Sequence, residues 1–362
     1  MTRLIIAIVL SFSTFVVGQN KKAVSLPEKD FEKFWTTFKD NYAFFELKGV
    51  NWDDAYTQYR SQVTSRTSQE ELINILGKMV DPLQDGHITI SIGDEVVYKA
   101  KRPSAFKKEF KGIEKDLWKT SFETLQKEKF AAVKGIGPVV NDEHLYYASQ
   151  SDGIGYIRIS RCFGTIESLY SSKKEAKDVK LMLTLFDSIL KSFASTKGII
   201  IDLRANGGGH AGDLLAKRFV LQKCLTHYKS TKIRGDYKTF SPLRSIVITP
   251  NKGVQYRNPI VILTNDKTAS SAEDFTLSLY KQSNVTTIGA NTSGMLSDMF
   301  ESKLSHDVYF TLSNDSYYTT DRILLEDRGV PVEIAMVNTK NDISSKRDPL
   351  IIKALEVLLA KN

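Results

Sequence analysis

The chain has 362 residues, of which 41% are hydrophobic and 25% charged, a composition typical of a soluble globular protein with one large domain and a smaller accessory region. Its net charge of +8 is spread over mixed stretches such as KKEFKGIEKDLWK, without an arginine-rich stripe, so we expect no nucleic-acid partner. Cys162 and Cys224 are too few for a disulfide scaffold, and the five histidines are isolated, so we expect no metal and no cofactor. The sequence leaves open whether the two cysteines pair or remain free.

The first residues have the form of an export signal. Arg3 precedes an apolar run from Leu4 to Val17 that is short for a membrane span, and Gly18 provides a small residue at a cleavage site before Gln19. We therefore expect a signal peptide over residues 1–18 and a mature protein exported to a periplasm or the extracellular space, without stable membrane insertion. An uncleaved amino-terminal anchor helix is the alternative.

Residues 19–90 are predicted to form a helical amino-terminal region. Ser68 and Glu71 have the spacing of a helix-start capping box. Apolar residues recur at helical spacing in two stripes, which we interpret as core packing. The stripes consist of Phe31, Phe34, Trp35 and Phe38, and of Leu72, Ile75, Leu76 and Met79.

Residues 91–150 are mixed in character and rich in lysine, and we interpret them as an insertion or a small linking region. From residue 151 to residue 362 the pattern changes to alternating strands and helices. The predicted strands GIGYIRIS, KGIIIDLR and NPIVILT are continuous apolar runs, and amphipathic stretches such as KEAKDVKLMLTLFDSILKSF separate them. Strands of this kind are buried on both faces, so the pattern predicts an α/β domain with a sheet covered by helices.

The stretch KTASSAEDF follows the strand NPIVILT directly. Ser270 and Glu273 have the S-x-x-E spacing of a capping box, which alone would explain both residues. The alternative is a nucleophilic role, because Ser270 would lie at the carboxyl end of a buried strand and at the amino end of a helix. Ligands bind at this edge of α/β sheets, and the next backbone N–H is ready to hold an oxyanion.

Three further stretches carry polar or glycine residues at such positions. Gly207 and Gly208 follow the strand GIIIDLR and permit a close backbone approach, although a plain tight turn is possible. His87 in DGHITI and Glu326 in LLEDRGVPV each stand in a loop, where a satisfied or solvated side chain is the ordinary interpretation.

Together these stretches resemble the carboxy-terminal processing (tail-specific) serine peptidase family, in particular its tricorn-core-like branch. The matching segments run in the family's order from about residue 150 to the end, with DGHITI upstream. They are GIGYIRIS, GIIIDLRANGGG, PIVILTNDKTASSAEDF, TTIGANTSGMLSD and LLEDRGVPVEI. The resemblance implies a crotonase/ClpP-like catalytic core, a mixed sheet flanked by helices.

The resemblance also implies roles for single residues. Ser270 corresponds to the nucleophile, and Ser271 with Gly207 or Gly208 to the backbone donors of the oxyanion hole. Met295 in GANTSGM occupies the position of the lysine base of the bacterial branch. His87 and Glu326 match the base and supporting acid of the tricorn-like branch, in which a serine precedes the histidine where this chain has Gly86.

The favoured function is therefore a serine-type peptidase that acts on peptide or protein substrates. Two alternatives stay open: a catalytically inactive relative that binds peptides or small apolar ligands, and a crotonase-type acyl-CoA enzyme, which the export signal disfavours. The family often carries a PDZ module, but residues 91–150 have no clear PDZ pattern, so the sequence does not predict specificity for carboxyl termini. It does not indicate an oligomeric state.

Overall fold

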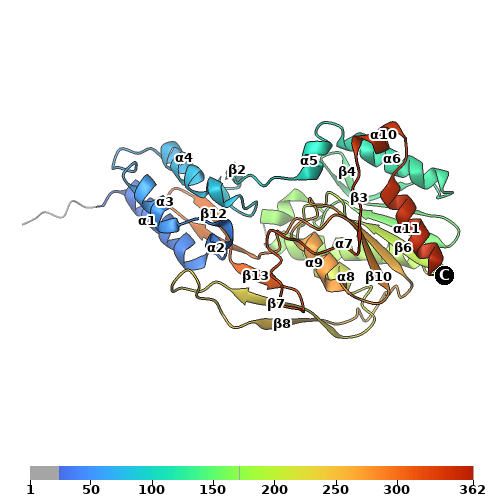
Figure 1. The fold of residues 1–362 in the computed structure, drawn as a ribbon. Helices are drawn as coiled ribbons and strands as arrows, with labels where there is room; N and C mark the ends of the chain where they lie inside the picture. Colours follow the sequence, from blue (N-terminus) through green and yellow to red (C-terminus); the bar gives the residue numbers. More distant parts are fainter. Residues whose placement is uncertain (1–23, 171, 362) are drawn as a thin grey trace, which may run out of the picture.

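The computed structural model describes residues 24–170 and 172–361, and the predicted signal peptide lies outside these residues. A smaller helical part and a larger α/β part lie side by side, and extended segments connect them (Figure 1). The predicted fold class, a mixed α/β protein with a helical amino-terminal region, is confirmed. Within the described residues no helix has the length and apolar character needed to cross a membrane.

The larger part is built on a seven-stranded sheet with the strand order β14-β10-β9-β6-β5-β4-β3. The central strands are parallel, whereas β3 and β4 pair antiparallel at one edge. The strands are β3 (Lys134–Val140), β4 (Glu143–Gln150), β5 (Ile154–Ile159), β6 (Gly198–Asp202), β9 (Ile260–Thr264), β10 (Val285–Gly289) and β14 (Ile334–Ala335).

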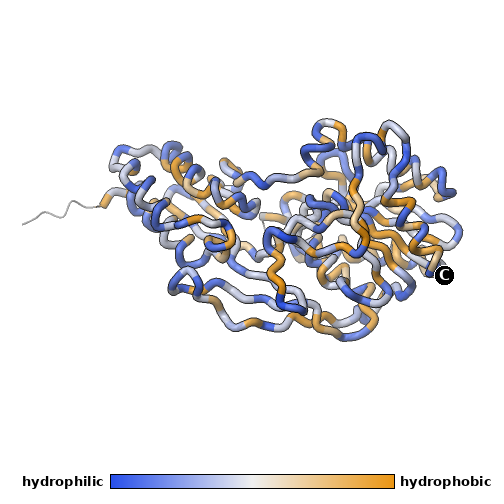
Figure 2. Tube along the Cα trace, in the orientation of Figure 1, coloured by the Kyte–Doolittle hydropathy of each residue, from blue (hydrophilic) through white to orange (hydrophobic). Residues whose placement is uncertain are grey.

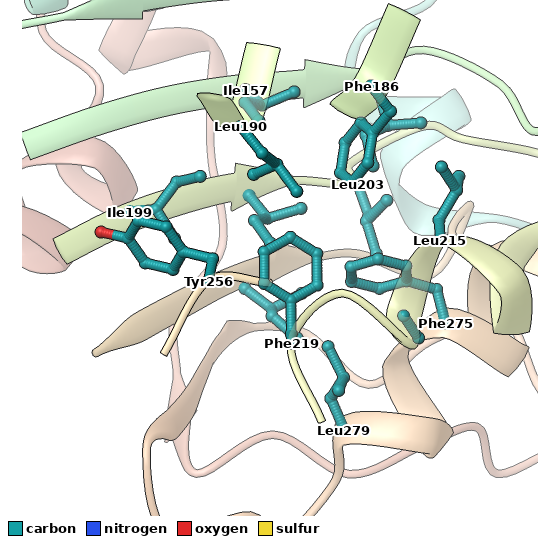
Figure 3. Close-up of a cluster of buried hydrophobic side chains, with 14 of the residues drawn as sticks. Ile157, Phe186, Leu190, Ile199, Leu203, Leu215, Phe219, Tyr256, Phe275 and Leu279 are labelled. Carbon is teal, nitrogen blue, oxygen red and sulfur yellow. The ribbon is translucent and has the colours of Figure 1, made fainter. Parts of the chain in front are cut away.

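Helices cover both faces of this sheet, which explains why its central strands β5, β6, β9 and β10 are buried at every position. Ile199 and Ile201 of β6 face a cluster formed with α7 (Ser172–Ser192), α8 (Gly212–Ala216) and α9 (Ser271–Leu279). Ile200 points to the opposite cluster, formed with α6 (Glu114–Lys127) and α11 (Pro349–Ala360). Figure 2 shows the apolar residues running along these strands. Figure 3 shows how Phe186, Phe219 and Phe275 gather in the first cluster.

The smaller part packs four helices on a second sheet with the order β11-β12-β1-β2. The helices are α1 (Leu26–Asn41), α2 (Phe45–Lys48), α3 (Trp52–Arg60) and α4 (Gln69–Val80), and the 3-10 turn η1 (Asp81–Leu83) follows. The strands are β1 (Thr89–Ile92), β2 (Glu95–Lys99), β11 (Met299–Lys303) and β12 (Val308–Ser313). The two predicted stripes do face this core: Phe31, Phe34 and Phe38 are fully buried, and Ile75 and Trp35 are partly buried.

Two segments lie elsewhere than their place in the sequence suggests. Residues 299–313, within the predicted catalytic region, leave the large sheet and pair with β1 in the smaller part. Of residues 91–150, β2 belongs to the smaller part, whereas α6, β3 and β4 extend the catalytic part. The short helix α5 (Ala105–Glu109) lies between them along the chain.

The remaining elements complete the larger part. A three-stranded sheet, β13-β7-β8, runs below both parts in Figure 1. Its strands are β7 (Cys224–Thr231), β8 (Arg244–Ile248) and β13 (Asp315–Tyr318), and the short elements are η2 (Ile166–Tyr170) and α10 (Lys340–Ser344). Cys162 and Cys224 are free thiols, which resolves the alternative that the sequence left open.

Candidate active site

Ser270 and the glycine loop lie next to each other at the carboxyl edge of the large sheet. They follow β9 and β6, which are adjacent parallel strands, so both segments leave the sheet at the same edge. The approach is close: a Cβ atom added to Gly208 would lie 2.7 Å from the Ser270 Cβ and 3.0 Å from the Ser271 backbone nitrogen. Gly208 has φ +98°, so both its backbone angle and its surroundings require glycine.

Ser270 has a strained backbone at the start of α9. Its φ of 53° and ψ of −126° lie outside the regions that residues other than glycine ordinarily adopt. Holding a residue in such a conformation costs about 1–3 kcal/mol of folding free energy. The Ser270 N–H donates to Glu273 Oε2 and to the Met295 carbonyl, each at 3.0 Å. The Ser270 hydroxyl faces the Glu273 N–H as in a capping box, but without a hydrogen bond of normal geometry. The serine of the S-x-x-E pattern therefore bonds to Glu273 through its backbone amide, and its hydroxyl is available for another interaction.

Glu273 organises the loop that faces Ser270. This fully buried carboxylate accepts hydrogen bonds from Thr292 Oγ1 at 2.6 Å, from the Gly294 N–H at 2.7 Å and from the Met295 N–H at 2.8 Å. Burial raises the pKa of Glu273 to about 7, against the lowering effect of these hydrogen bonds. The sequence identified Glu273 as a capping residue but gave no signal of this second role.

Two backbone N–H groups beside Ser270 are unpaired. In the described part of the chain neither Ser271 nor Gly207 donates its N–H to a partner, and a Cβ on Gly207 would meet open space. The Gly208 N–H instead donates to Asn206 Oδ1 at 2.9 Å. Of the predicted oxyanion-hole residues, Ser271 and Gly207 thus have free donors, whereas the donor of Gly208 is already engaged.

His87 enters β1 from a loop that is fixed on several sides. Its N–H donates to Asp85 Oδ1 at 2.9 Å, its carbonyl accepts from Thr311 Oγ1 at 2.6 Å, and its Nδ1 lies 3.4 Å from Ser313 Oγ. The ring is buried, and its Nε2 has no hydrogen-bond partner among the residues that the structure describes. Burial lowers the pKa of His87 below its usual 6.5, against the opposing charge of Asp85. The imidazole is therefore neutral at neutral pH.

Met295 contacts both the backbone of Ser270 and the loop that carries Gly86 and His87. A Cβ added to Gly86 would lie 2.7 Å from Met295 Cε and 3.0 Å from its sulfur, while the Met295 carbonyl accepts the Ser270 N–H. A serine at position 86 would need Met295 to move. The two departures from the family pattern, Gly86 and Met295, are thus in contact and fit each other sterically.

Glu326 lies in a buried acidic environment. It is 2% exposed, and its Oε1 has no hydrogen-bond partner within residues 24–170 and 172–361. Burial, followed by the charge of Asp85, raises the pKa of Glu326 well above its usual value. The Tyr42 hydroxyl is buried near Asp85 and Glu326. Burial, followed by the charges of these two carboxyl groups, raises the pKa of Tyr42. The environment therefore favours the protonated form of Glu326, which can donate a hydrogen bond.

A polar cavity of about 660 Å³ opens beside these loops, between the two parts of the molecule. Lys48, Gln84 and Arg102 line it from the smaller part, and Asn291, Ser293 and Asp327 from the larger part. The contacts of Arg102 with Ser293, Gly294 and Asp327 had no signal in the sequence, because the surrounding KRPS matches no motif.

Comparisons with known proteins match two regions of the chain to family models. The family model described as peptidase family S41 matches residues 153–336, and the model of the tricorn protease C1 domain matches residues 27–81. The carboxy-terminal processing protease CtpA of Bacillus subtilis (strain 168) is 31% identical over 156 residues, which are 39% of this chain and 32% of that protein. The chain therefore spans about a third of the length of this curated relative.

Solved structures share the fold over nearly the whole chain. A protein of Parabacteroides merdae ATCC 43184, described as a candidate peptidase, is 26% identical with a TM-score of 0.71, covering 93% of this chain and 98% of that one. Mature CPAF complexed with lactacystin is 14% identical with a TM-score of 0.61, covering 92% and 97%. The tricorn protease is 15% identical with a TM-score of 0.56, covering 92% of this chain and 36% of its own.

The matched residues 153–336 make up just over half of the chain and contain Ser270, the glycine loop and Glu326. His87 lies between the two matched regions, on the loop that Met295 contacts through Gly86. The family predicted from the sequence motifs is confirmed: this chain belongs to peptidase family S41.

Proposed function

We propose that the protein hydrolyses peptide bonds in peptide or protein substrates, with Ser270 as the nucleophile, His87 as the general base and Glu326 as a supporting acid. The observation that carries the proposal is the backbone conformation of Ser270 together with its unbonded hydroxyl. Its backbone is strained, its hydroxyl makes no capping hydrogen bond of normal geometry, and its Cβ faces Gly208 across a gap too small for any side chain. Strain at a single residue is typical of functional sites, where the surrounding structure holds it in place.

The proposed reaction uses groups that have no other partner in the described residues. His87 Nε2 takes the hydroxyl proton of Ser270 while Oγ attacks the substrate carbonyl carbon, and the N–H groups of Ser271 and Gly207 donate to the oxyanion. Collapse breaks the C–N bond, and the imidazolium returns its proton to the leaving amine. Water then attacks the acyl ester by the same route and releases the carboxylic acid product, restoring Ser270.

Glu326 contributes in this proposal as a neutral acid. Because burial and the charge of Asp85 raise its pKa, its protonated form is favoured, and in that form it adds no negative charge beside the base and serves as a hydrogen-bond donor next to Asp85. Asp85 in turn accepts the His87 N–H, so Asp85 holds the histidine loop and does not exchange protons with the substrate.

The test is labelling with a fluorophosphonate, which reacts with activated serine hydroxyls. We expect the wild-type protein to be labelled and Ser270→Ala to be unlabelled, with turnover of peptides reduced by several orders of magnitude. The melting temperature should change little, because the hydroxyl makes no capping bond. Ser278→Ala, in the same helix, is the control and should label like the wild type.

Two outcomes would contradict this assignment. Labelling that survives in Ser270→Ala but disappears in Ser271→Ala would make Ser271 the nucleophile. An unlabelled wild-type protein that still binds peptides would favour the inactive relative, which the replacement of the family lysine by Met295 makes a specific alternative.

Export is a separate proposal that rests on residues 1–18. If the apolar run from Leu4 to Val17 acts as a signal, the mature protein begins at Gln19. Intact-mass measurement on protein secreted by an expressing cell tests this directly. A protein that retains Met1 and sediments with membranes would instead indicate an uncleaved anchor.

A further inference from the structure

Arg102 bonds to loops that adjoin the proposed catalytic groups, at Ser293, Gly294 and Asp327, and lies beside Gly86. It lies on the connection from β2 to α5 and is 16% exposed at its side chain. A Cβ added to Gly86, the residue before His87, would lie 3.7 Å from the Arg102 Cβ. Its guanidinium donates from Nε to Ser293 Oγ at 3.1 Å, from Nη2 to the Ser293 and Gly294 carbonyls, and from Nη1 to Asp327 Oδ1 at 2.8 Å.

The segment from Ser293 to Met295 determines the position of Ser270. The Gly294 and Met295 N–H groups donate to Glu273, and the Met295 carbonyl accepts the Ser270 N–H. The two carbonyls that Arg102 binds are therefore one or two residues away from the one that holds the nucleophile. A shift of this segment would move the Ser270 backbone with it.

The Glu326 loop is joined to the same point. The Asp327 N–H donates to the Gly294 carbonyl at 3.0 Å. A Cβ on Gly294 would lie 2.7–2.8 Å from the backbone nitrogens of residues 327–329, so the two loops are in direct contact. Arg102 binds both sides of this contact, the carbonyl of Gly294 and the carboxylate of Asp327.

We propose that Arg102 is a positioning residue for the proposed hydrolysis, which clamps residues 293–295 to the loop of Glu326 and Asp327 beside Gly86. The inference rests on the proposed function. Only a planar guanidinium can reach these acceptors together, since a lysine ammonium is a compact point charge. Lys48 bonds to the same Asp327 oxygen at 2.8 Å but makes no bond to Ser293 or Gly294 in the described structure, so it assists with one loop alone.

The experiment measures the rate of fluorophosphonate labelling in Arg102→Ala, Arg102→Lys and the wild type. We expect Arg102→Ala to label about 100-fold more slowly, since displacement of a reacting group by about 1 Å costs this much. Guanidinium, at a concentration that leaves the wild-type melting temperature unchanged, should restore part of the rate by refilling the vacated site. Arg102→Lys should be intermediate, and the loss in peptide turnover should fall on kcat rather than KM.

Arg60→Ala is the matched control. Arg60 is likewise a partly buried arginine in an ion pair, but its two carboxylate partners, Glu28 and Glu32, both lie in α1 of the smaller part. It should label at the wild-type rate. Equal labelling of Arg102→Ala and wild type would overturn the clamp while leaving the proposed function intact. A loss that neither guanidinium nor lysine reverses would also overturn it, as it would indicate general misfolding, whereas an unlabelled wild type would remove the proposed function itself.

Discussion

At the scale of single residues, two serines with the same sequence pattern have different structures. Ser68 and Ser270 both precede a glutamate by three positions, and in both cases this glutamate accepts the serine N–H. Ser68 has φ −72° and its hydroxyl accepts the Glu71 N–H at 3.3 Å, an ordinary helix cap. Ser270 has φ 53° and its hydroxyl makes no capping hydrogen bond of normal geometry. The pattern predicts the glutamate contact but not the backbone angle, which Gly208 and Met295 impose from outside the helix.

The buried state of His87 makes a prediction about pH. A general base acts in its neutral form, and burial lowers the pKa of His87 below 6.5, so the ring stays neutral to lower pH than an exposed histidine. The labelling rate should therefore fall on acidification at a lower pH than it would for an exposed histidine with a pKa of 6.5. Labelling rates measured between about pH 4 and 10, with circular dichroism as a check on folding, test this. A rise centred near pH 10 would instead indicate a lysine base.

At the scale of elements, the sequence was most informative where a strand and a loop are consecutive. Continuous apolar runs identified β6 and β9, and residues that follow them, Gly208 and Ser270, do meet at one sheet edge. The prediction that these residues meet succeeded because the carboxyl ends of adjacent parallel strands are close, whatever conformation the loops adopt.

Pairings between distant segments could not be predicted in the same way. β12 pairs with β1, as in the register of Phe310 with Ile90, although 220 positions separate them in the sequence. Neither strand carries a local feature that identifies its partner. The contacts of Arg102 were missed for the same reason, because a single arginine in a linking segment has many possible partners and only the folded chain selects Ser293, Gly294 and Asp327.

At the scale of the whole molecule, the two parts share the chain repeatedly. The chain passes from the smaller to the larger part after β2, returns before β11 and leaves again after β12. The predicted base therefore lies on the smaller part, and the predicted nucleophile on the larger part. The aromatic core of the smaller part is consequently connected to the site, since Phe310 lies on β12 beside β1, the strand that His87 precedes.

This connection predicts that Phe34→Ala destabilises the whole protein in one cooperative transition. Phe34 is fully buried, and its ring centroid lies 4.6 Å from that of Phe38 and 4.7 Å from that of Phe310. Its truncation should lower the free energy of unfolding by about 3–5 kcal/mol. Thermal and denaturant unfolding measure this, with Phe300→Ala as the control, because Phe300 is 36% exposed on the neighbouring β11 and should cost far less. Two separate transitions, of which only the lower one moves, would show instead that the smaller part folds by itself and that the site is assembled from independent units.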